Sequence, residues 1–78
     1  MAARKAVCVV WTDSCSPQRW TDHDSLEGYT PEEITSVGFV VKSGRKHMTI
    51  AAHVSASQAD GIMCIPRSAI RSVKKVVL

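Results

Sequence analysis

The chain has 78 residues and a formal net charge of +3. This length indicates one domain, because chains of this size bury only about 60–65% of their unfolded surface and are modestly stable. So small a core leaves little room for a deep catalytic cavity, and we expect no enzymatic activity. The apolar run 6–11 is far shorter than the roughly 20 residues that cross a bilayer. It is also too short for a signal peptide, so we expect a cytoplasmic protein without a membrane partner.

Charge is distributed unevenly along the chain. Residues 1–33 carry three basic groups against six acids, whereas residues 34–78 carry seven basic groups against one acid, Asp60. This division predicts an acidic loop over one side of the fold and a basic surface elsewhere. The alternative is that both are ordinary solvated surfaces.

The three cysteines cannot all pair within one chain, and none belongs to a Cys-x-x-Cys motif. We therefore expect free thiols in a reducing cytosol. Cys8 and Cys64 lie in apolar strand patterns and are predicted to pack as small hydrophobic residues. Cys15 lies in a polar loop and is the thiol most able to react.

The first strand is predicted at 4–12, with Val7, Val9 and Trp11 on one face. A long acidic loop, 12–34, follows, and loops of this length are often functional. Its apolar residues Trp20, Leu26 and Tyr29 are expected to hold it against the rest of the domain. The order Thr-Pro-Glu-Glu at 30–33 predicts one helical turn with a Thr N-cap.

The segment 35–54 predicts a β-hairpin, with its turn at Ser43-Gly44-Arg45. Alternation places Val37, Phe39 and Val41 on one face of the first of these strands, and we expect Phe39 to be a core aromatic. Met48, Ile50 and Ala52 face the core from the other strand. Gly38 would permit a bend or a close approach of the backbone.

Two further strands complete the predicted fold. Residues 61–65 form a short strand that ends at Pro66, which donates no ladder hydrogen bond. Residues 67–69 predict a one-turn 3₁₀ helix, and 70–77 a closing strand with Val73 facing in. The sequence therefore predicts an all-β, mainly β, single domain over 1–78: a small five-stranded barrel with a long first loop and a 3₁₀ turn before the last strand.

The segment Gly-Ile-Met-Cys-Ile-Pro-Arg-Ser-Ala-Ile at 61–70 resembles the end of Src-homology-3-type barrels. In those barrels a strand runs into an apolar residue, a proline and a 3₁₀ turn, positions that Ile65, Pro66 and Ile70 match here. The chain lacks the aromatic pairs that line the proline-rich-peptide groove of that family. The resemblance therefore implies the fold and not that ligand.

Two other resemblances lead to different families. The segment 65–73 is compatible with the last strand of Sm-like barrels, although the N-terminal helix of that family is absent. The whole pattern is similar to short uncharacterised proteins of tailed bacteriophages and prophages, and this resemblance implies no established activity. The residues that carry it are Trp11, Asp13, Ser14, Ser36, Val37, Gly38, Phe39, Ile65, Pro66 and Ile70.

Binding to an unidentified protein is the function that we predict first. The surfaces that suit it are an exposed strand edge, which could also mediate self-association, and the long loop with Trp20, Leu26 and Tyr29. The apolar end 76–78 either serves such an edge or packs on the chain's own first strand.

Weak nucleic-acid binding is the alternative prediction. It would use a basic patch on the hairpin tip and the last strand, although no aromatic residue is interleaved there for base stacking. The predicted patch consists of Lys42, Arg45, Lys46, Arg67, Arg71, Lys74 and Lys75.

The remaining polar residues do not indicate a catalytic or metal site. The Asp-His-Asp run at 22–24 could bind a divalent metal with Asp13, Cys15 or His53, but its spacing matches no ligand motif. A Cys15 nucleophile with His23 or His53 as its base lacks an evident oxyanion hole. We therefore expect no cofactor, no metal and no catalytic residue.

Overall fold

Five antiparallel strands form one sheet in the computed structural model, which describes residues 4–14 and 20–78. The strand order is β4-β3-β2-β1-β5, so the first strand lies between the second and the last. The elements are β1 (Ala6–Asp13), η1 (His23–Gly28), β2 (Glu32–Ser43), β3 (His47–Val54), β4 (Ala59–Pro66), η2 (Arg67–Ala69) and β5 (Ile70–Val76), where η is a 3₁₀ helix. The predicted all-β class, the five strands and the 3₁₀ turn before the last strand are confirmed.

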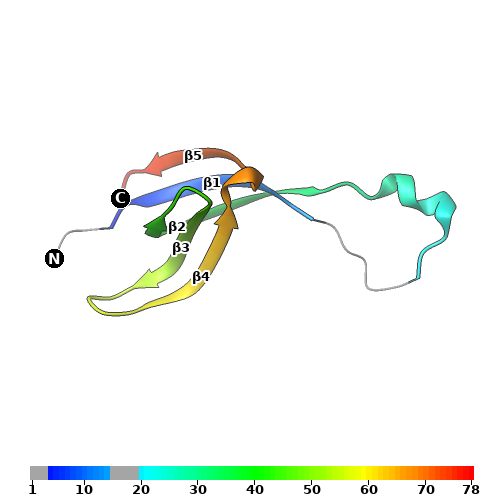
Figure 1. Ribbon diagram of the computed structural model, residues 1–78. Helices are drawn as coiled ribbons and strands as arrows, with labels where there is room; N and C mark the ends of the chain where they lie inside the picture. Colours follow the sequence, from blue (N-terminus) through cyan, green and yellow to red (C-terminus); the bar gives the residue numbers. More distant parts are fainter. Residues whose placement is uncertain (1–3, 15–19) are drawn as a thin grey trace.

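The molecule consists of a body and a projecting arm (Figure 1). We define the arm as residues 12–14 and 20–35, and the body as residues 4–11 and 36–78. The far ends of β1 and β2 form the base of the arm, where Asp13 pairs with Glu32. The longest dimension of the molecule is 55 Å, against 24 and 22 Å for the other two. The arm points away from the sheet, which corrects the prediction that its apolar residues hold it against the domain.

The core lies on one face of the sheet, the inner face. Val7 and Val9 of β1 alternate with half-buried Cys8 and Val10, as a strand with one covered face requires. The buried cluster comprises Val7, Val9, Met48, Ile50 and Ile65, and the partly buried residues that pack against it are Trp11, Val40, Ala69 and Ile70. The predicted inward positions of Met48 and Ile50 are confirmed.

Phe39 lies on the opposite side of the sheet, the outer face, so its predicted role as a core aromatic is wrong. It pairs with Ala6 of β1 and with Ala51 of β3, and both of these residues alternate with core residues. Val40, the next residue of β2, packs against the core instead. Phe39 is only partly buried.

Gly38 allows β2 and β3 to approach closely, as predicted. A Cβ at this position would lie 3.0 Å from the carbonyl oxygen of Ala51 and 3.2 Å from the Cβ of Ile50. Real side chains rarely tolerate such distances, because the packed backbone has no room to move. A side chain at this position would therefore push β2 and β3 apart beside the core residue Ile50.

The sheet curls but does not close into a barrel, in contrast to the prediction. β4 pairs with β3 and β5 pairs with β1, and along the described residues these two edge strands do not pair with each other. Register shifts at Val10/Trp11 and between Val40 and Lys42 bend the sheet, as bulges do. The bend brings η2 over the core without joining the two edges.

Several boundaries differ from the predicted ones. Residues 30–33 form no helical turn, because Glu32 and Glu33 belong to β2, and the helical turn lies instead at His23–Gly28. β4 begins two residues earlier than predicted, at Ala59. At the C-terminal end Val76 pairs with Ala6, whereas the two residues after it are exposed and do not pack on the first strand.

The described thiols are not core residues. Cys8 is partly buried and Cys64 is exposed, so the predicted buried role is wrong for Cys64. Cys15 lies outside the described residues. Along those residues, no helix has the length and apolar character that spanning a bilayer would require.

Candidate functional site

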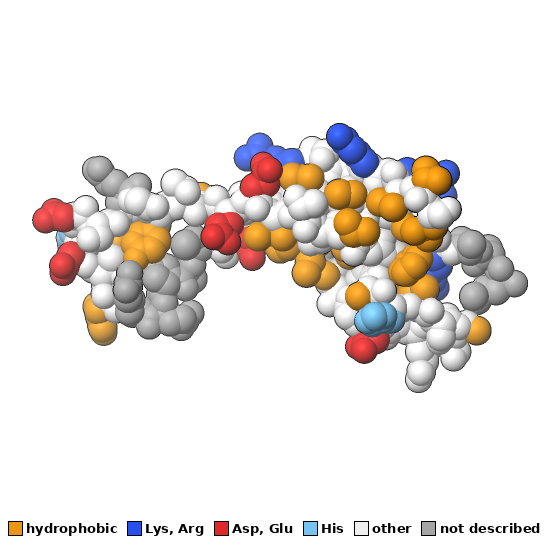
Figure 2. Space-filling model, turned by 180° about the vertical axis from the view of Figure 1, so that it is seen from behind, with side chains coloured by type: hydrophobic (Ala, Val, Ile, Leu, Met, Phe, Trp, Pro, Cys, Tyr) orange, Lys and Arg blue, Asp and Glu red, His pale blue; other side chains and the backbone are white. Residues whose placement is uncertain are grey.

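The outer face of the sheet is apolar, and none of the described helices or strands covers it. In each strand its residues alternate with the residues that face the core. The pairings of β1 with β2, β2 with β3 and β3 with β4 place them side by side across four strands. They are Ala6, Cys8 and Val10 of β1, Val37 and Phe39 of β2, Ala51 of β3, and Ile62 and Cys64 of β4. Figure 2 shows hydrophobic side chains gathered across the body and acidic side chains concentrated on the arm.

Two large side chains of this face are well exposed. Val37 retains 62% of its accessible surface and Ile62 retains 54%. Ala6 and Ala51 are buried between their larger neighbours and form the floor of the face. An antiparallel sheet with one solvated side normally carries polar residues there. The apolar outer face is therefore the feature of this fold that needs an explanation other than the core.

β4 extends this apolar surface to an edge of the sheet. Among the described residues, its backbone is unpaired on the side away from β3. Ile62 lies on the outer face, whereas Met63 pairs with the core residue Ile50 and is exposed on the inner side. Asp60 is the one charged residue within the strand. The other edge, β5, carries Lys74 and Lys75, and lysines on an edge discourage pairing with another chain. The predicted self-association through a strand edge is therefore better suited to β4, and it stays a prediction.

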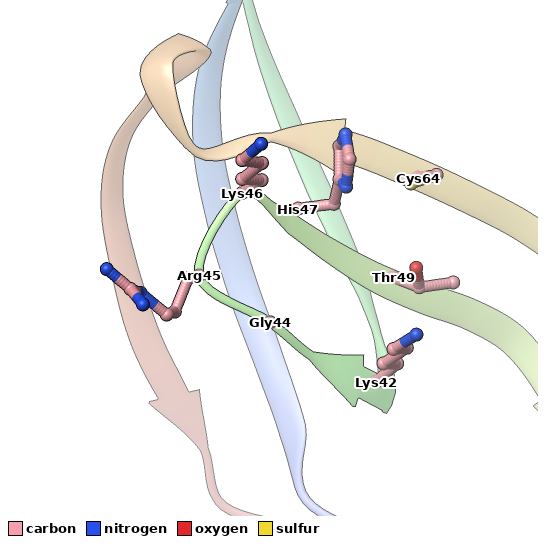
Figure 3. Close-up of a pocket in the computed structure, with 7 residues that line it drawn as sticks. All are labelled: Lys42, Gly44, Arg45, Lys46, His47, Thr49 and Cys64. Carbon is pink, nitrogen blue, oxygen red and sulfur yellow. The ribbon is translucent and has the colours of Figure 1, made fainter.

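A basic pocket lies on the outer face at the turn between β2 and β3 (Figure 3). It encloses about 650 Å³ and is lined by Lys42, Gly44, Arg45, Lys46, His47, Thr49 and Cys64. Thr49 and Cys64 face each other across β3 and β4, next to the apolar part of the outer face. Figure 3 shows the side chain of Arg45 directed away from the other cations. The described residues that line the pocket include no acid, so the pocket suits a negatively charged group.

Arg67 fixes the shape of this turn from the core side. Its Nε donates to the carbonyl oxygen of Gly44 at 3.0 Å, and its Nη2 donates to Oγ of Ser43 at 2.6 Å. Its backbone N–H also donates to the carbonyl oxygen of Lys46 at 2.8 Å. These bonds use the planar donors of the guanidinium, which makes Arg67 a structural residue of the turn rather than a free cation.

The predicted basic patch is divided by the structure. Lys42, Arg45 and Lys46 line the pocket, and Arg67 lies behind the same turn. Arg71 belongs to the other edge of the sheet, where its Nε donates to Oγ1 of Thr12 at 3.1 Å. Lys74 pairs with Cys8 and therefore faces outward, whereas Lys75 pairs with Val7 and faces the core side.

The predicted protein-binding loop residues lie on the arm. Trp20 is fully exposed and Leu26 is about half exposed, while Tyr29 is partly buried. η1 positions Leu26 through two backbone bonds, from the N–H of Ser25 to the oxygen of Asp22 and from the N–H of Tyr29 to the oxygen of Leu26. The arm therefore presents Trp20 and Leu26 to solvent.

The described part of the chain shows no arrangement of side chains that supports the metal or the catalytic alternative. No group of three His, Cys, Asp or Glu side chains there could hold a metal ion. Asp22, His23 and Asp24 are exposed on the arm. His53 lies opposite Asp60 on β3 and β4, at a second hollow of about 610 Å³. The Cys15 alternative lies outside the described residues.

The outer face is the feature that sequence reasoning missed. The first strand did show Cys8 and Val10 between its core residues, and 61–65 is apolar at four of its five positions. A strand with apolar side chains on both of its faces is either covered on both sides or leaves one apolar side open to solvent. Comparison with family models, curated proteins and solved structures finds no match to this chain. The three resemblances inferred from the sequence therefore stay predictions.

Proposed function

We propose that this protein is a small, non-enzymatic interaction module that binds another protein on the outer face of its sheet. The uncovered apolar surface across β1, β2, β3 and β4 is the observation that carries the proposal. Contiguous exposed apolar surface is uncommon on monomeric proteins, and where it occurs it frequently marks an interaction site. Binding a partner would remove Val37 and Ile62 from water, which favours association and offsets part of the freedom lost when two molecules combine.

The exposed edge of β4 gives this face a second means of recognition. An extended segment of a partner can add to such an edge through main-chain hydrogen bonds, and nearby apolar side chains supply specificity. Ile62 lies beside that edge on the outer face, and Met63 lies beside it on the inner side. Face and edge together support binding to a protein rather than to a small molecule, because both are open surfaces.

The test is capture of a partner by the parent and by variants with one new charge on the face. Val37→Lys and Ile62→Lys place a lysine on the outer face, whereas Ala56→Lys adds the same charge in the turn between β3 and β4. All three should keep the parent's stability within about 0.5 kcal/mol, because the substituted positions are exposed. The parent and Ala56→Lys should retain a protein from an extract of the producing cells that the two face variants lose.

The captured protein is then purified, and its dissociation constant is measured by calorimetry with each variant. We expect each face variant to weaken binding about tenfold or more, which corresponds to about 1.4 kcal/mol. Equal affinity of all four proteins would contradict the proposal, as would the absence of any partner that distinguishes the parent from the face variants.

Binding of nucleic acid is the second candidate, and the basic pocket favours it. Lys42, Arg45 and Lys46 offer positive charge at one turn, without an acid in the lining. Affinity for a random duplex oligonucleotide should fall steeply with salt if these cations neutralise phosphates. Absence of binding at low salt removes this candidate, whereas steep salt dependence that Lys46→Glu weakens would place it first.

A further inference from the structure

The charges of this protein are separated between its two parts. The arm and the segment that it spans, residues 12–35, carry six acids and one arginine, whereas the body carries nine basic residues and one acid, Asp60. The acids of the arm with described side chains are all exposed: Asp13, Asp22, Asp24, Glu32 and Glu33. The arm extends along the 55 Å axis away from the body (Figure 1), so each molecule presents an acidic end and a basic end.

The exposed part of the arm combines apolar and acidic groups. Trp20 is fully exposed and Leu26 is about half exposed, and Asp22 and Asp24 lie between them in sequence. Tryptophan is the residue type most often found at the energetic centre of protein interfaces. A surface that receives this segment needs an apolar area beside positive charge.

The body provides such a surface. The outer face offers exposed Val37 and Ile62, and the basic pocket adjoins it along β3 and β4 with Lys42 and Lys46 in its lining. The apolar area and the cations thus lie on one side of the sheet. This arrangement complements the arm in both hydrophobicity and charge, and such complementarity selects partners and orients them.

We propose that the partner is a second copy of this chain, whose arm docks on the outer face of the first. The inference rests on the proposed function and names its partner. Trp20 and Leu26 of one copy would cover the apolar area around Val37 and Ile62, while the arm's carboxylates face Lys42 and Lys46. The contact is heterologous, since different surfaces meet. Repetition of such a contact gives a ring or an open filament, and a reciprocal exchange of arms between two copies gives a closed dimer.

Pairing of β4 with the β4 of a second copy is the competing mode of self-association. It would form a symmetric dimer through main-chain bonds and would leave the arm unused. The arm mode is favoured, because it accounts for the charge separation and for the exposure of Trp20 together. The two modes differ in their response to charge, and this difference is the basis of the test.

The test uses two charge-reversed variants of the full chain. Asp22→Lys/Asp24→Lys makes the tip of the arm, residues 20–26, basic, and Lys42→Glu/Lys46→Glu makes the pocket acidic. Molecular mass is measured by sedimentation over a range of protein concentrations, at low and at high salt. The parent should associate beyond the 8.5 kDa of one chain at low salt and lose this association at high salt. Each variant alone should dissociate about tenfold more readily or more, because like charges meet at its contact.

An equimolar mixture of the two variants should recover the parent's association. In the mixture each basic arm tip can meet an acidic pocket and each acidic arm tip can meet a basic pocket, so both contacts are restored. A further variant, Trp20→Ser, should weaken association without any change of charge. Circular dichroism of each variant confirms that the sheet is retained.

Three results would overturn this inference. They are a parent that stays monomeric at all conditions, variants that associate as well as the parent, and a mixture that associates no better than its components. None of these results decides the proposed function. That function is tested separately by whether Val37→Lys and Ile62→Lys fail to capture a different protein that the parent retains. Association that only β4-edge substitutions disrupt would assign self-association to the edge instead.

Discussion

Replacement of Ile65 by alanine tests which face of the sheet holds the core. Ile65 is 1% exposed and lies in the buried cluster with Val9 and Ile50. The substitution removes three carbon atoms, each worth about 0.8 kcal/mol when buried. The cavity left behind adds to this loss, so we expect the free energy of unfolding to fall by about 3–4 kcal/mol.

This loss is large for a domain of this size. A total stability of about 0.05–0.15 kcal/mol per residue gives about 4–12 kcal/mol for this chain. Urea unfolding followed by circular dichroism measures the change, and the midpoint should fall by about 1–4 M if the slope is about 1–3 kcal/mol per molar urea. Ile65→Val is the graded control, with an expected loss of about 0.5–1.5 kcal/mol.

Phe39→Ala is the opposing control on the outer face. Phe39 is larger than Ile65, yet it is only partly buried and its removal opens no enclosed cavity. We expect a loss of about 1–2 kcal/mol, smaller than that of Ile65→Ala. If Phe39→Ala costs more than Ile65→Ala, the faces of the sheet are assigned the wrong way round.

Three further substitutions test local features of the fold. Gly61→Ala should destabilise the protein by about 1–3 kcal/mol in urea unfolding, because Gly61 has a φ of 66° and a Cβ there would lie 2.8 Å from that of Ala52; an unchanged midpoint would contradict this strain. Arg67→Ala should speed amide hydrogen exchange at the turn after β2 about tenfold or more, because the turn loses two side-chain donors. Arg67→Lys should exchange as fast as Arg67→Ala, because lysine lacks the planar pair of donors. Unchanged exchange would show that the turn holds its shape without Arg67. Trp11→Phe should lower the free energy of unfolding by about 1–3 kcal/mol, because it removes the indole donor 3.1 Å from Oγ of Ser36 and part of a ring that packs against the core. A stability equal to the parent's would contradict both contributions.

The sequence was sufficient for those elements that local chemistry determines. Pro66 ends the strand before it, and the three residues after it form the predicted 3₁₀ turn. The predicted bounds of β1 agree with the observed ones to within one or two residues, because its Val-rich alternation and the polar residues after it leave few alternatives. These features depend on neighbours in the chain.

Assignments that depend on distant contacts were less secure. Apart from Gly38, residues 37–41 of β2 are all apolar, so both faces of this part of the strand are apolar. Alternation alone therefore does not decide which face packs on the core. The Thr-Pro-Glu-Glu run has a good N-terminal helix pattern, but Glu32 and Glu33 pair with β1 instead. Closure of the barrel would require pairing of β4 with β5, which no local pattern specifies.

The candidate site was predictable only in part. The turn after β2 was expected to be basic, and the structure places Lys42, Arg45 and Lys46 around one pocket there. Lys74 and Lys75 are adjacent in sequence and therefore point to opposite faces of β5, which divides the predicted patch. The apolar outer face cannot be recognised from any one strand, because it is formed by residues of four strands that the register places side by side.

The central claim is that this sheet buries one apolar face and leaves the other open for a partner. Nuclear magnetic resonance with a soluble paramagnetic agent measures it most directly, at about 0.5 M salt to screen contacts between copies. We predict strong broadening of the methyl signals of Val37 and Ile62, with the methyl signals of Ile50 and Ile65 protected. Protection of Val37 and Ile62 in the monomer would contradict the claim, because it would show that the outer face is already covered.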